Sequence, residues 1–507
     1  MDTIFNGIAL GAAQMLDPIA LLLIAFGTVF GIVIGSLPGL TSTMGVALLV
    51  PVTFTMSPVQ GLSLLGAVYC SSTYAGAISA ILLNIPGTPS NCSTVLDGYP
   101  MTRQGRAGEA IALATAGSAI GGFVSNGALL FLAPPLAALA LRFGSQEYFL
   151  LALFGVSVIA SLSERNILKG FISGTLGLFL AIIGMHPLTG DIRFTMDIPE
   201  LFNGLPMVVA LIGLYSLPEI IENLSQPANM AQASVAEVRG GFRQMLQILK
   251  YKMLLLRATL IGIVAGVVPG AGSSIAGFLA YDDAKRVSKS PQTFGSGNPE
   301  GVVSSETANN AVVGGSLVPA LTLGIPGNAV SAVMLGGLMI HGLKPGPGLF
   351  TDSGGITYGF ILSMFLANLF FIPVGLMVAR FGVSFIKTPA SILGPLVIGL
   401  GVIGAYAINM SLVDVWIMMA MGLLGYAMKR FDVPREPLVL GLVLGSMAEG
   451  ELARSMALVQ DSVPTLIGSF FTRPLSLLIM GLTLLSIVQA VRAYRRRVQA
   501  EQALSRP

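Results

Sequence analysis

The sequence predicts an all-α, polytopic integral membrane protein made of two repeated halves with paired broken helices or re-entrant hairpins. Hydrophobic residues make up 54% of the chain and charged residues only 10%, whereas soluble domains carry about 25% charged residues. Residues 18–96 and 307–340 contain no Asp, Glu, Lys, Arg or His. Each run is far longer than the roughly 20 residues that cross a bilayer once.

Three short motifs of the first half return in the same order in the second half. They are Pro38-Gly39 and Pro269-Gly270, Pro86-Gly87 and Pro326-Gly327, and Arg142-Phe143-Gly144 and Arg380-Phe381-Gly382. The partners stand 231, 240 and 238 residues apart, and such nearly constant spacing indicates an internal duplication. Because paired broken helices accompany inverted repeats in transporters, we expect inverted topology, with parallel repeats as the alternative.

The apolar segments follow in order along the chain. Residues 2–16 predict a short amphipathic helix on the surface. The first half then gives apolar segments at 18–37, 43–56, 61–83, 109–141, 147–162, 166–186 and 205–221, and the second at 253–280, 308–340, 356–379, 388–409, 411–428, 435–447 and 466–490. Segments 43–56 and 435–447 are too short to span cleanly and are candidate hairpin arms.

Charge divides the chain into five parts. They are an amphipathic segment 1–17, a first transmembrane repeat 18–221, a linker 222–252, a second transmembrane repeat 253–490 and a basic tail 491–507. The linker and the tail are rich in Arg and Lys, so we expect both to be cytoplasmic.

Composition also excludes several classes of protein. Cys70 and Cys92 form neither a disulfide framework nor a metal motif. The net charge of +3 is too small to indicate nucleic acid binding, and the bilayer is the expected environment. No residue is assigned a catalytic or metal-binding role, and no cofactor is expected.

Small residues with hydroxyl or amide groups follow the Pro-Gly breaks. A helix that restarts after a break exposes unpaired N–H groups and its positive dipole end, which together bind anions without a basic side chain. Unwound carbonyls before a break can hold a cation such as Na⁺. The candidate substrate-binding residues are Pro38, Gly39, Thr41, Ser42, Pro86, Gly87, Thr88, Ser90, Asn91, Pro269, Gly270, Gly272, Ser273, Pro326, Gly327 and Asn328. A single Pro-Gly is more often a kink, but four in duplicated order favour a site.

A second polar cluster begins the uncharged run of the second half. Glu306 and Asn310 are four residues apart and share a face if the segment is helical. The candidate cation-binding residues are Thr43, Glu306, Asn309 and Asn310. The alternative for Glu306 is an N-terminal helix cap.

Three charged residues near the second break have simpler interpretations. Asp97, in an Asp-Gly pair, is interpreted as a turn residue. Arg103 and Arg106 fit a positive-inside role better than an anion site.

Five strings together resemble one known family. They are GSLPGLTSTMGVALLVP, ILLNIPGTPSNCSTVLDGYPMTRQGRAGEA, GVVPGAGSSIAGFLAY, FGSGNPEGVVSSETANNA and LTLGIPGNAVSAVMLGGLMIHGLKPGPGLF. They resemble the large membrane subunit of the tripartite tricarboxylate transporters, the TctA type, from about residue 18 to residue 455. The resemblance implies a small four-span membrane subunit and a periplasmic solute-binding protein as partners, organic carboxylates as substrates, and a bacterial inner membrane location.

The expected function is therefore secondary active transport of tricarboxylates such as citrate, or of dicarboxylates, by alternating access. The resemblance implies an ion gradient as the energy source, with Na⁺ as the expected coupling ion, and the chain has no phosphate-binding loop for ATP. One alternative is a self-sufficient sodium–carboxylate symporter. An intramembrane enzyme would need a base, which the uncharged runs lack, and a passive channel is separable by counterflow exchange.

Overall fold

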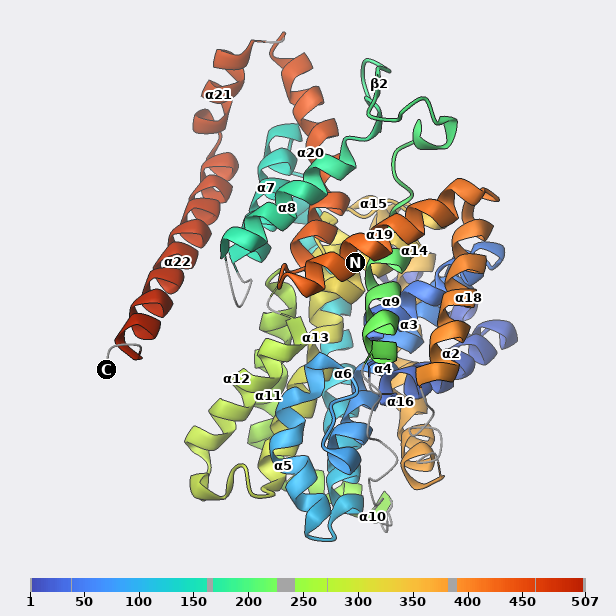
Figure 1. The fold of residues 1–507 in the computed structure, drawn as a ribbon, viewed down its shortest axis with the longest axis vertical. Coiled ribbons are helices and arrows are strands. Elements are labelled where there is room, and N and C mark those ends of the chain that lie inside the picture. Colours follow the sequence, from blue (N-terminus) through green and yellow to red (C-terminus); the bar gives the residue numbers. More distant parts are fainter. Residues whose placement is uncertain are drawn as a thin grey trace. The chain divides into compact units, whose positions relative to one another are not determined.

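The computed structural model describes residues 2–37, 39–161, 167–225, 242–270, 272–381, 390–460 and 462–504. The predicted all-helical membrane fold is confirmed, since the described chain is almost entirely helix (Figure 1). The strands in these ranges are β1 (Gly184–Met185) and β2 (Ile192–Arg193), which pair antiparallel. Pro38, linker residues 226–241 and the last three residues lie outside the described residues.

The helices of the first half have these bounds: α1 (Asp2–Met15), α2 (Pro18–Ser36), α3 (Ser42–Leu49), η1 (Pro51–Thr55), α4 (Pro58–Leu83), η2 (Pro89–Asn91), α5 (Cys92–Arg103), α6 (Ala107–Ala140), α7 (Ser145–Ser161), α8 (Ile167–Ala181), η3 (Pro199–Leu201) and α9 (Met207–Ser225). Those of the second half are α10 (Phe242–Met245), η5 (Leu246–Tyr251), α11 (Lys252–Val267), α12 (Gly272–Val287), η6 (Pro291–Thr293), α13 (Pro299–Leu323), α14 (Ala329–Ile340), α15 (Gly348–Thr351), α16 (Gly354–Phe381), α18 (Ala390–Asn409), α19 (Leu412–Arg430), α20 (Glu436–Leu458), α21 (Val463–Thr472) and α22 (Pro474–Leu504).

The chain folds into two compact units. Unit 1 holds residues 1–137 and 215–410, and unit 2 holds residues 138–214 and 411–507. Each unit therefore takes one stretch from each half of the sequence. This division into units does not test the predicted repeat boundaries, which are 18–221 and 253–490. Those boundaries stay a prediction.

In unit 1, α2 packs against α4 through glycines spaced by one helical turn. A Cβ on Gly31 would press on the carbonyl oxygen of Val68, and one on Gly35 would press on that of Ser72. Glycines four apart on one face allow two helix backbones to approach closely, as in small-xxx-small membrane motifs. The α4 helix is buried all round, which is why it shows no polar face.

The second half of unit 1 repeats this packing between α11 and α13. A Cβ on Gly262 would press on the carbonyl oxygen of Ala308, and one on Gly266 on that of Val312. The two glycines stand 231 residues after Gly31 and Gly35, and their partners 240 residues after those of the first half. The α2–α4 crossing and the α11–α13 crossing are therefore related by 231 and 240 residues, the same offsets that separate the Pro-Gly motifs.

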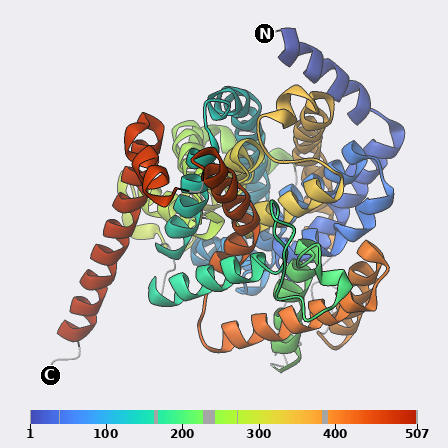
Figure 2. The ribbon, with the colours of Figure 1, turned by 90° about the horizontal axis from the view of Figure 1, so that it is seen from above.

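The predicted N-terminal helix is present as α1, but one of its faces is covered. Gly7 lies against the ring of Tyr358, and Gly11 lies against the backbone of Gly359, so α1 packs on α16 within unit 1. Figure 2 shows α1 at the N-terminal end of the ribbon, leading into α2.

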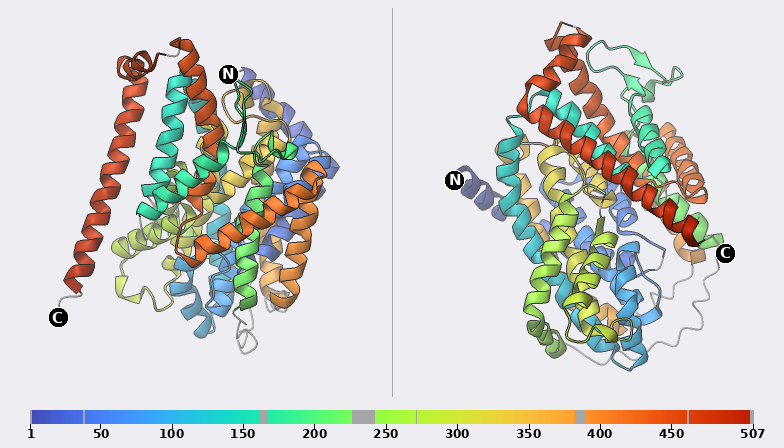
Figure 3. Two further views of the ribbon diagram at one scale, coloured as in Figure 1. Left: turned by 45° about the horizontal axis from the view of Figure 1, so that its top comes forward. Right: turned by 90° about the vertical axis from the view of Figure 1, so that its left-hand side faces the viewer.

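Unit 2 is built on α7, α8, α20 and α22. Glu147 at the start of α7 has no exposed surface; its Oε1 lies 3.1 Å from Arg473 Nε and accepts a 2.6 Å hydrogen bond from Ser476. After α21 the chain bends by 90° into α22, as Figure 3 shows.

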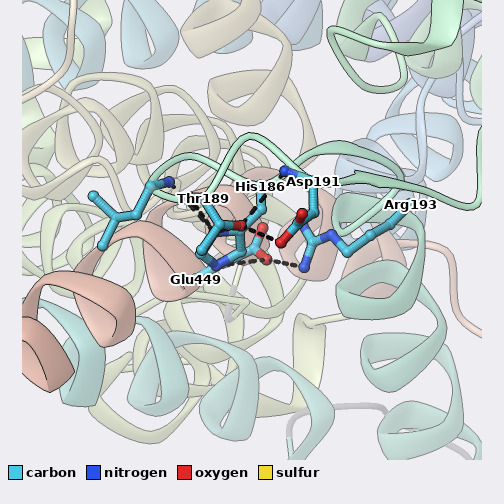
Figure 4. A network of polar contacts seen from close by, with 6 residues as sticks. His186, Thr189, Asp191, Arg193 and Glu449 are labelled. Carbon is cyan, nitrogen blue, oxygen red and sulfur yellow. Dashed lines mark hydrogen bonds and ion pairs between the residues drawn. The ribbon is translucent and has the colours of Figure 1, made fainter. Parts of the chain in front are cut away.

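A polar network ties the β-hairpin of unit 2 to α20. Arg193 on β2 pairs with Glu449 of α20 at 2.5 Å, and Thr189 donates to Asp191 at 2.6 Å. His186 accepts from the backbone N–H of Thr189 at 3.1 Å. Figure 4 shows these side chains converging between the hairpin and the helix.

Five described helices are long and apolar enough to cross a membrane, or six if the bent pair α21 and α22 counts as one span. The short segment 43–56 is confirmed as α3 and η1. The predicted end of segment 435–447 is wrong, because α20 continues to Leu458. Apolarity fades after residue 447 while the helix, rich in Ala, Met, Leu and Glu, does not end.

Candidate functional site

The first two breaks lie where α2 and α4 end. Gly39 has a φ of 85°, and Thr41 caps α3 by accepting from Met44 N at 3.2 Å. The α4 helix ends at Asn84 in the left-handed region with φ 60°. The chain then turns through Gly87 and η2 before α5 begins.

The second two breaks lie where α11 and α13 end. Gly270 has a φ of 82°, and α13 ends at Gly324 with φ 71°. Gly270 N donates to Gly327 O at 2.9 Å, so these two breaks meet directly. Asn328 caps α14 in a reciprocal box with Ser331.

Gly87 and Gly327, the glycines of the second Pro-Gly motif in each half, have equivalent neighbours. A Cβ on Gly87 would press on Gly35 O and lie 2.7 Å from the Cα of Gly76. A Cβ on Gly327 would press on Gly266 O and lie 2.8 Å from the Cα of Ser316. Glycine is needed at both positions because backbone occupies the space.

An asparagine follows the second break of each half and reaches a long helix of the other half. Asn91 Nδ2 lies 2.9 Å from Glu306 Oε1 on α13. Asn328 Nδ2 lies 2.7 Å from the hydroxyl of Tyr69 on α4, which is itself 2.9 Å from Ser316 Oγ. The breaks of each half are therefore tied to the centre of the other half.

Glu306 lies within α13 and has no exposed surface. Its carboxylate accepts from Asn91, from the hydroxyl of Thr94 on α5, and from Ser118 on α6 at 3.1 Å. The alternative that Glu306 caps a helix is wrong. The cap of α13 is Asn298, whose side chain accepts from Glu300 N at 2.8 Å, so Glu306 stands two turns further on.

The interpretation of Asp97 as a turn residue is also wrong, because Asp97 lies inside α5. Its Oδ1 accepts backbone N–H groups from Gly295, Gly297 and Asn298 at 2.8–2.9 Å, and its Oδ2 accepts from Tyr281 at 2.8 Å. Asp97 therefore fixes the loop that leads into α13.

Arg106 contacts an acidic side chain and a backbone carbonyl. Its Nε lies 2.9 Å from Glu109 Oε2, and its Nη1 lies 3.3 Å from the carbonyl oxygen of Gly297.

All described candidate residues belong to unit 1, with different exposures. Those buried are Ser42, Thr43, Gly87, Thr88, Asn91, Pro269, Glu306, Asn309, Asn310, Pro326 and Gly327, and those half-buried are Gly39, Thr41, Pro86, Ser90, Gly270, Gly272, Ser273 and Asn328. A Cβ on Gly272, whose φ is 63°, would meet nothing within 4 Å. The start of α12 thus has room for a side chain at Gly272, in contrast to the breaks at Gly87 and Gly327.

The structure joins some of the candidates and leaves others apart. Asn91 and Asn309 both donate to the carbonyl oxygen of Thr73, at 3.3 and 3.1 Å. Since Asn91 also donates to Glu306, the second break and two of the cation candidates, Glu306 and Asn309, form one cluster. Among the described residues, no hydrogen bond joins Thr41 or Ser42 to this cluster.

Several residues that complete these clusters were missed from the sequence. They are Tyr69, Thr73, Ser118 and Ser316. Tyr69 and Thr73 are one turn apart in an uncharged helix, a polar stripe that could have singled them out. Ser118 and Ser316 gave no such signal, because only the crossing of helices places them.

The comparisons with known proteins identify the family of the chain. The family model described as "Tripartite tricarboxylate transporter TctA family" matches residues 21–440. An uncharacterized 52.8 kDa protein in the TAR-I ttuC' 3'region of Agrobacterium vitis is 35% identical over 506 residues, covering 99% of this chain and all of the relative. An uncharacterized protein in the TAR-II ttuC' 3'region of the same organism is 35% identical over 230 residues, covering 45% of this chain and 93% of the relative. No solved structure matches the chain significantly. A multi-pass helical chain with four duplicated helix breaks, matched over most of its length by this family model, belongs to the TctA family of tripartite tricarboxylate transporters.

Proposed function

We propose that this chain is the translocating subunit of a binding-protein-dependent secondary transporter in the bacterial cytoplasmic membrane. It takes an organic carboxylate, a tricarboxylate such as citrate or a dicarboxylate, from a periplasmic solute-binding protein. It works with a small four-span membrane subunit and uses an ion gradient, with Na⁺ as the coupling ion. Family membership supports the partners and the substrate class.

The observation that carries the proposal is the set of four helices that begin within five residues of a break, with η2 lying between the break and α5. These helices are α3, α5, α12 and α14, and all lie in unit 1. Each start presents backbone N–H groups and a positive dipole end, which suit a carboxylate in a site without basic side chains. The half-buried Ser273 and the open space at Gly272 make the start of α12 the most accessible of the four.

The division into units supports a transport mechanism by alternating access. All described breaks fall in one unit, and the matched packing of α2 on α4 and of α11 on α13 supports the duplication that inverted repeats require. We propose that unit 1 carries the substrate as a body between its two accessible states.

The test is reconstituted uptake of labelled carboxylates. The chain goes into liposomes with or without the small subunit, with or without the binding protein, and with an inward Na⁺ or K⁺ gradient. Uptake that needs both partners and Na⁺ supports the proposal. Full uptake by the chain alone would instead indicate a self-sufficient symporter, and the absence of counterflow exchange would indicate a channel.

A further inference from the structure

Three carboxylates in the described residues have no exposed surface, and two of them have fixed partners. Asp97 is held by three backbone N–H groups and a tyrosine hydroxyl. Glu147 lies 3.1 Å from Arg473 and accepts from Gly144 N at 2.8 Å. Backbone N–H groups and a guanidinium thus offset part of the cost of burying these two carboxylates.

Glu306 is the exception. Its donors are three side chains, those of Asn91, Thr94 and Ser118, and no Lys, Arg or His pairs with it in the described chain. Neutral donors offset only part of the cost of burying a full negative charge. Side-chain donors can also turn away, whereas the backbone donors of Asp97 cannot.

Buried oxygen atoms without a partner surround the same turn of α13. Asn309 donates from Nδ2 to Thr73 O, the carbonyl that Asn91 also uses, while its own Oδ1 has no partner. The hydroxyls of Ser305 and Thr307 and the amide of Asn310 are buried and unpartnered as well. Buried polar atoms without partners are rare and point to an absent ligand or water.

We propose that Glu306, the Thr73 carbonyl and Asn309 Oδ1 form the binding site of the coupling Na⁺, an inference that rests on the proposed function. The site offers a carboxylate, a carbonyl and an amide oxygen, the hard oxygen ligands that non-transition cations prefer. The cation supplies the positive charge that Glu306 lacks, and it replaces the amide N–H groups that now satisfy Glu306 and Thr73.

The same contacts connect this site to the substrate break. Asn91 lies in η2 and bridges Glu306 Oε1 and Thr73 O, while its Oδ1 accepts from Thr88 at 2.6 Å. When Na⁺ takes these two oxygen atoms, Asn91 is released and the segment after Gly87 is free to rearrange. Cation binding and substrate binding then share one movable residue, which is the physical requirement for coupling.

The test measures Na⁺ binding without transport. The purified full chain in detergent, without substrate, is heated in NaCl or in KCl at equal ionic strength. Na⁺ should raise the apparent melting temperature in a saturable way. Glu306→Gln should remove the Na⁺ effect or raise the half-saturating Na⁺ concentration at least about tenfold, whereas Glu300→Gln, on the first turn of the same helix, should leave it unchanged.

A second variant covers the case in which Glu306→Gln does not fold. Asn309→Ala keeps the charge of Glu306 and removes one proposed ligand, so it should raise the half-saturating Na⁺ about tenfold. A native chain that shows no Na⁺ stabilisation, or stabilisation that survives both substitutions, overturns the assignment. Failure of carboxylate uptake with a normal Na⁺ response would instead contradict the proposed function and leave the cation site standing.

Discussion

The amide of Asn91 and the carboxylate of Glu306, 215 residues apart in sequence, form a 2.9 Å hydrogen bond that neither residue shares with solvent. After the second break of the other half, Asn328 donates to Tyr69. Both hydrogen bonds join the segment after a break in one half to a long helix of the other half. Only the Asn91–Glu306 pair contains a carboxylate, and this difference underlies the proposed cation site.

The first prediction concerns Asn91. Replacing Asn91 by Ala should lower the free energy of unfolding by about 1–3 kcal/mol, because Glu306 and Thr88 lose a buried partner. Melting temperature in detergent measures the loss, and Asn203→Ala, at an exposed position, is the control. Equal melting of the two variants would show that the contact contributes nothing to stability.

The second prediction concerns Gly87 and Gly327. Both glycines are candidate substrate-binding residues, but even the Cβ of Ala would press on Gly35 O or Gly266 O. Either Gly→Ala change should lower the yield of monodisperse protein and the melting temperature. The control is Gly127→Ala on α6, where a Cβ meets nothing within 4 Å; stable variants at 87 and 327 would refute the packing.

The sequence was most informative about the breaks themselves. The Pro-Gly motifs mark the ends of α2 and α11, and they lie within three residues of the ends of α4 and α13. Pro removes a helix hydrogen bond, and Gly39 and Gly270 take the left-handed φ that glycine accepts. The start of α13 was also readable, since Asn298 followed by Pro299 is a cap with Pro at the first position.

Other features depend on tertiary contacts and could not be read from sequence. The Asp97-Gly98 pair looks like a turn, yet Gly98 is there because a Cβ would lie 2.7 Å from Ile81 of α4. Ser118 reaches Glu306 only because α6 passes α13 at Gly121, where a Cβ would press on Thr307 O. Such close crossings involve single small residues that carry no periodic signal.

The third prediction separates a structural carboxylate from a functional one. Asp97→Asn should lower stability by about 1–3 kcal/mol, because the charge that three backbone N–H groups face is lost and Tyr281 meets an amide donor. The half-saturating Na⁺ concentration of the folded variant should not change. Asp282→Asn, at a side chain 64% exposed, controls for charge. A changed Na⁺ response in Asp97→Asn would place Asp97 in the cation site.

The fourth prediction concerns the hairpin of unit 2. Glu449→Gln removes the charge that pairs with Arg193, so the segment 184–196 should become more sensitive to limited proteolysis. Glu451→Gln is the matched control, two residues on along α20, where the partner is Arg454 on the same helix. Equal cleavage of both variants would show that the ion pair does not hold the hairpin, as is common for exposed pairs.

The last prediction concerns how the carboxylate is held. If half-helix N–H groups and small polar side chains bind it, Ser273→Ala and Asn328→Ala should raise the apparent KM for substrate, each by the equivalent of about 1–3 kcal/mol. Arg103→Gln and Arg106→Gln should change the KM less, since Arg106 already bonds to Glu109 and Gly297.

Uptake by the reconstituted three-component system measures all four variants, and their melting temperatures separate binding from folding. Because Asn328 also bonds to Tyr69, Tyr69→Phe is the companion variant that removes this partner while keeping the amide. Loss of substrate binding in the arginine variants, with the serine and asparagine variants unaffected, would show that the site is a basic pocket and that the breaks serve only to shape the fold.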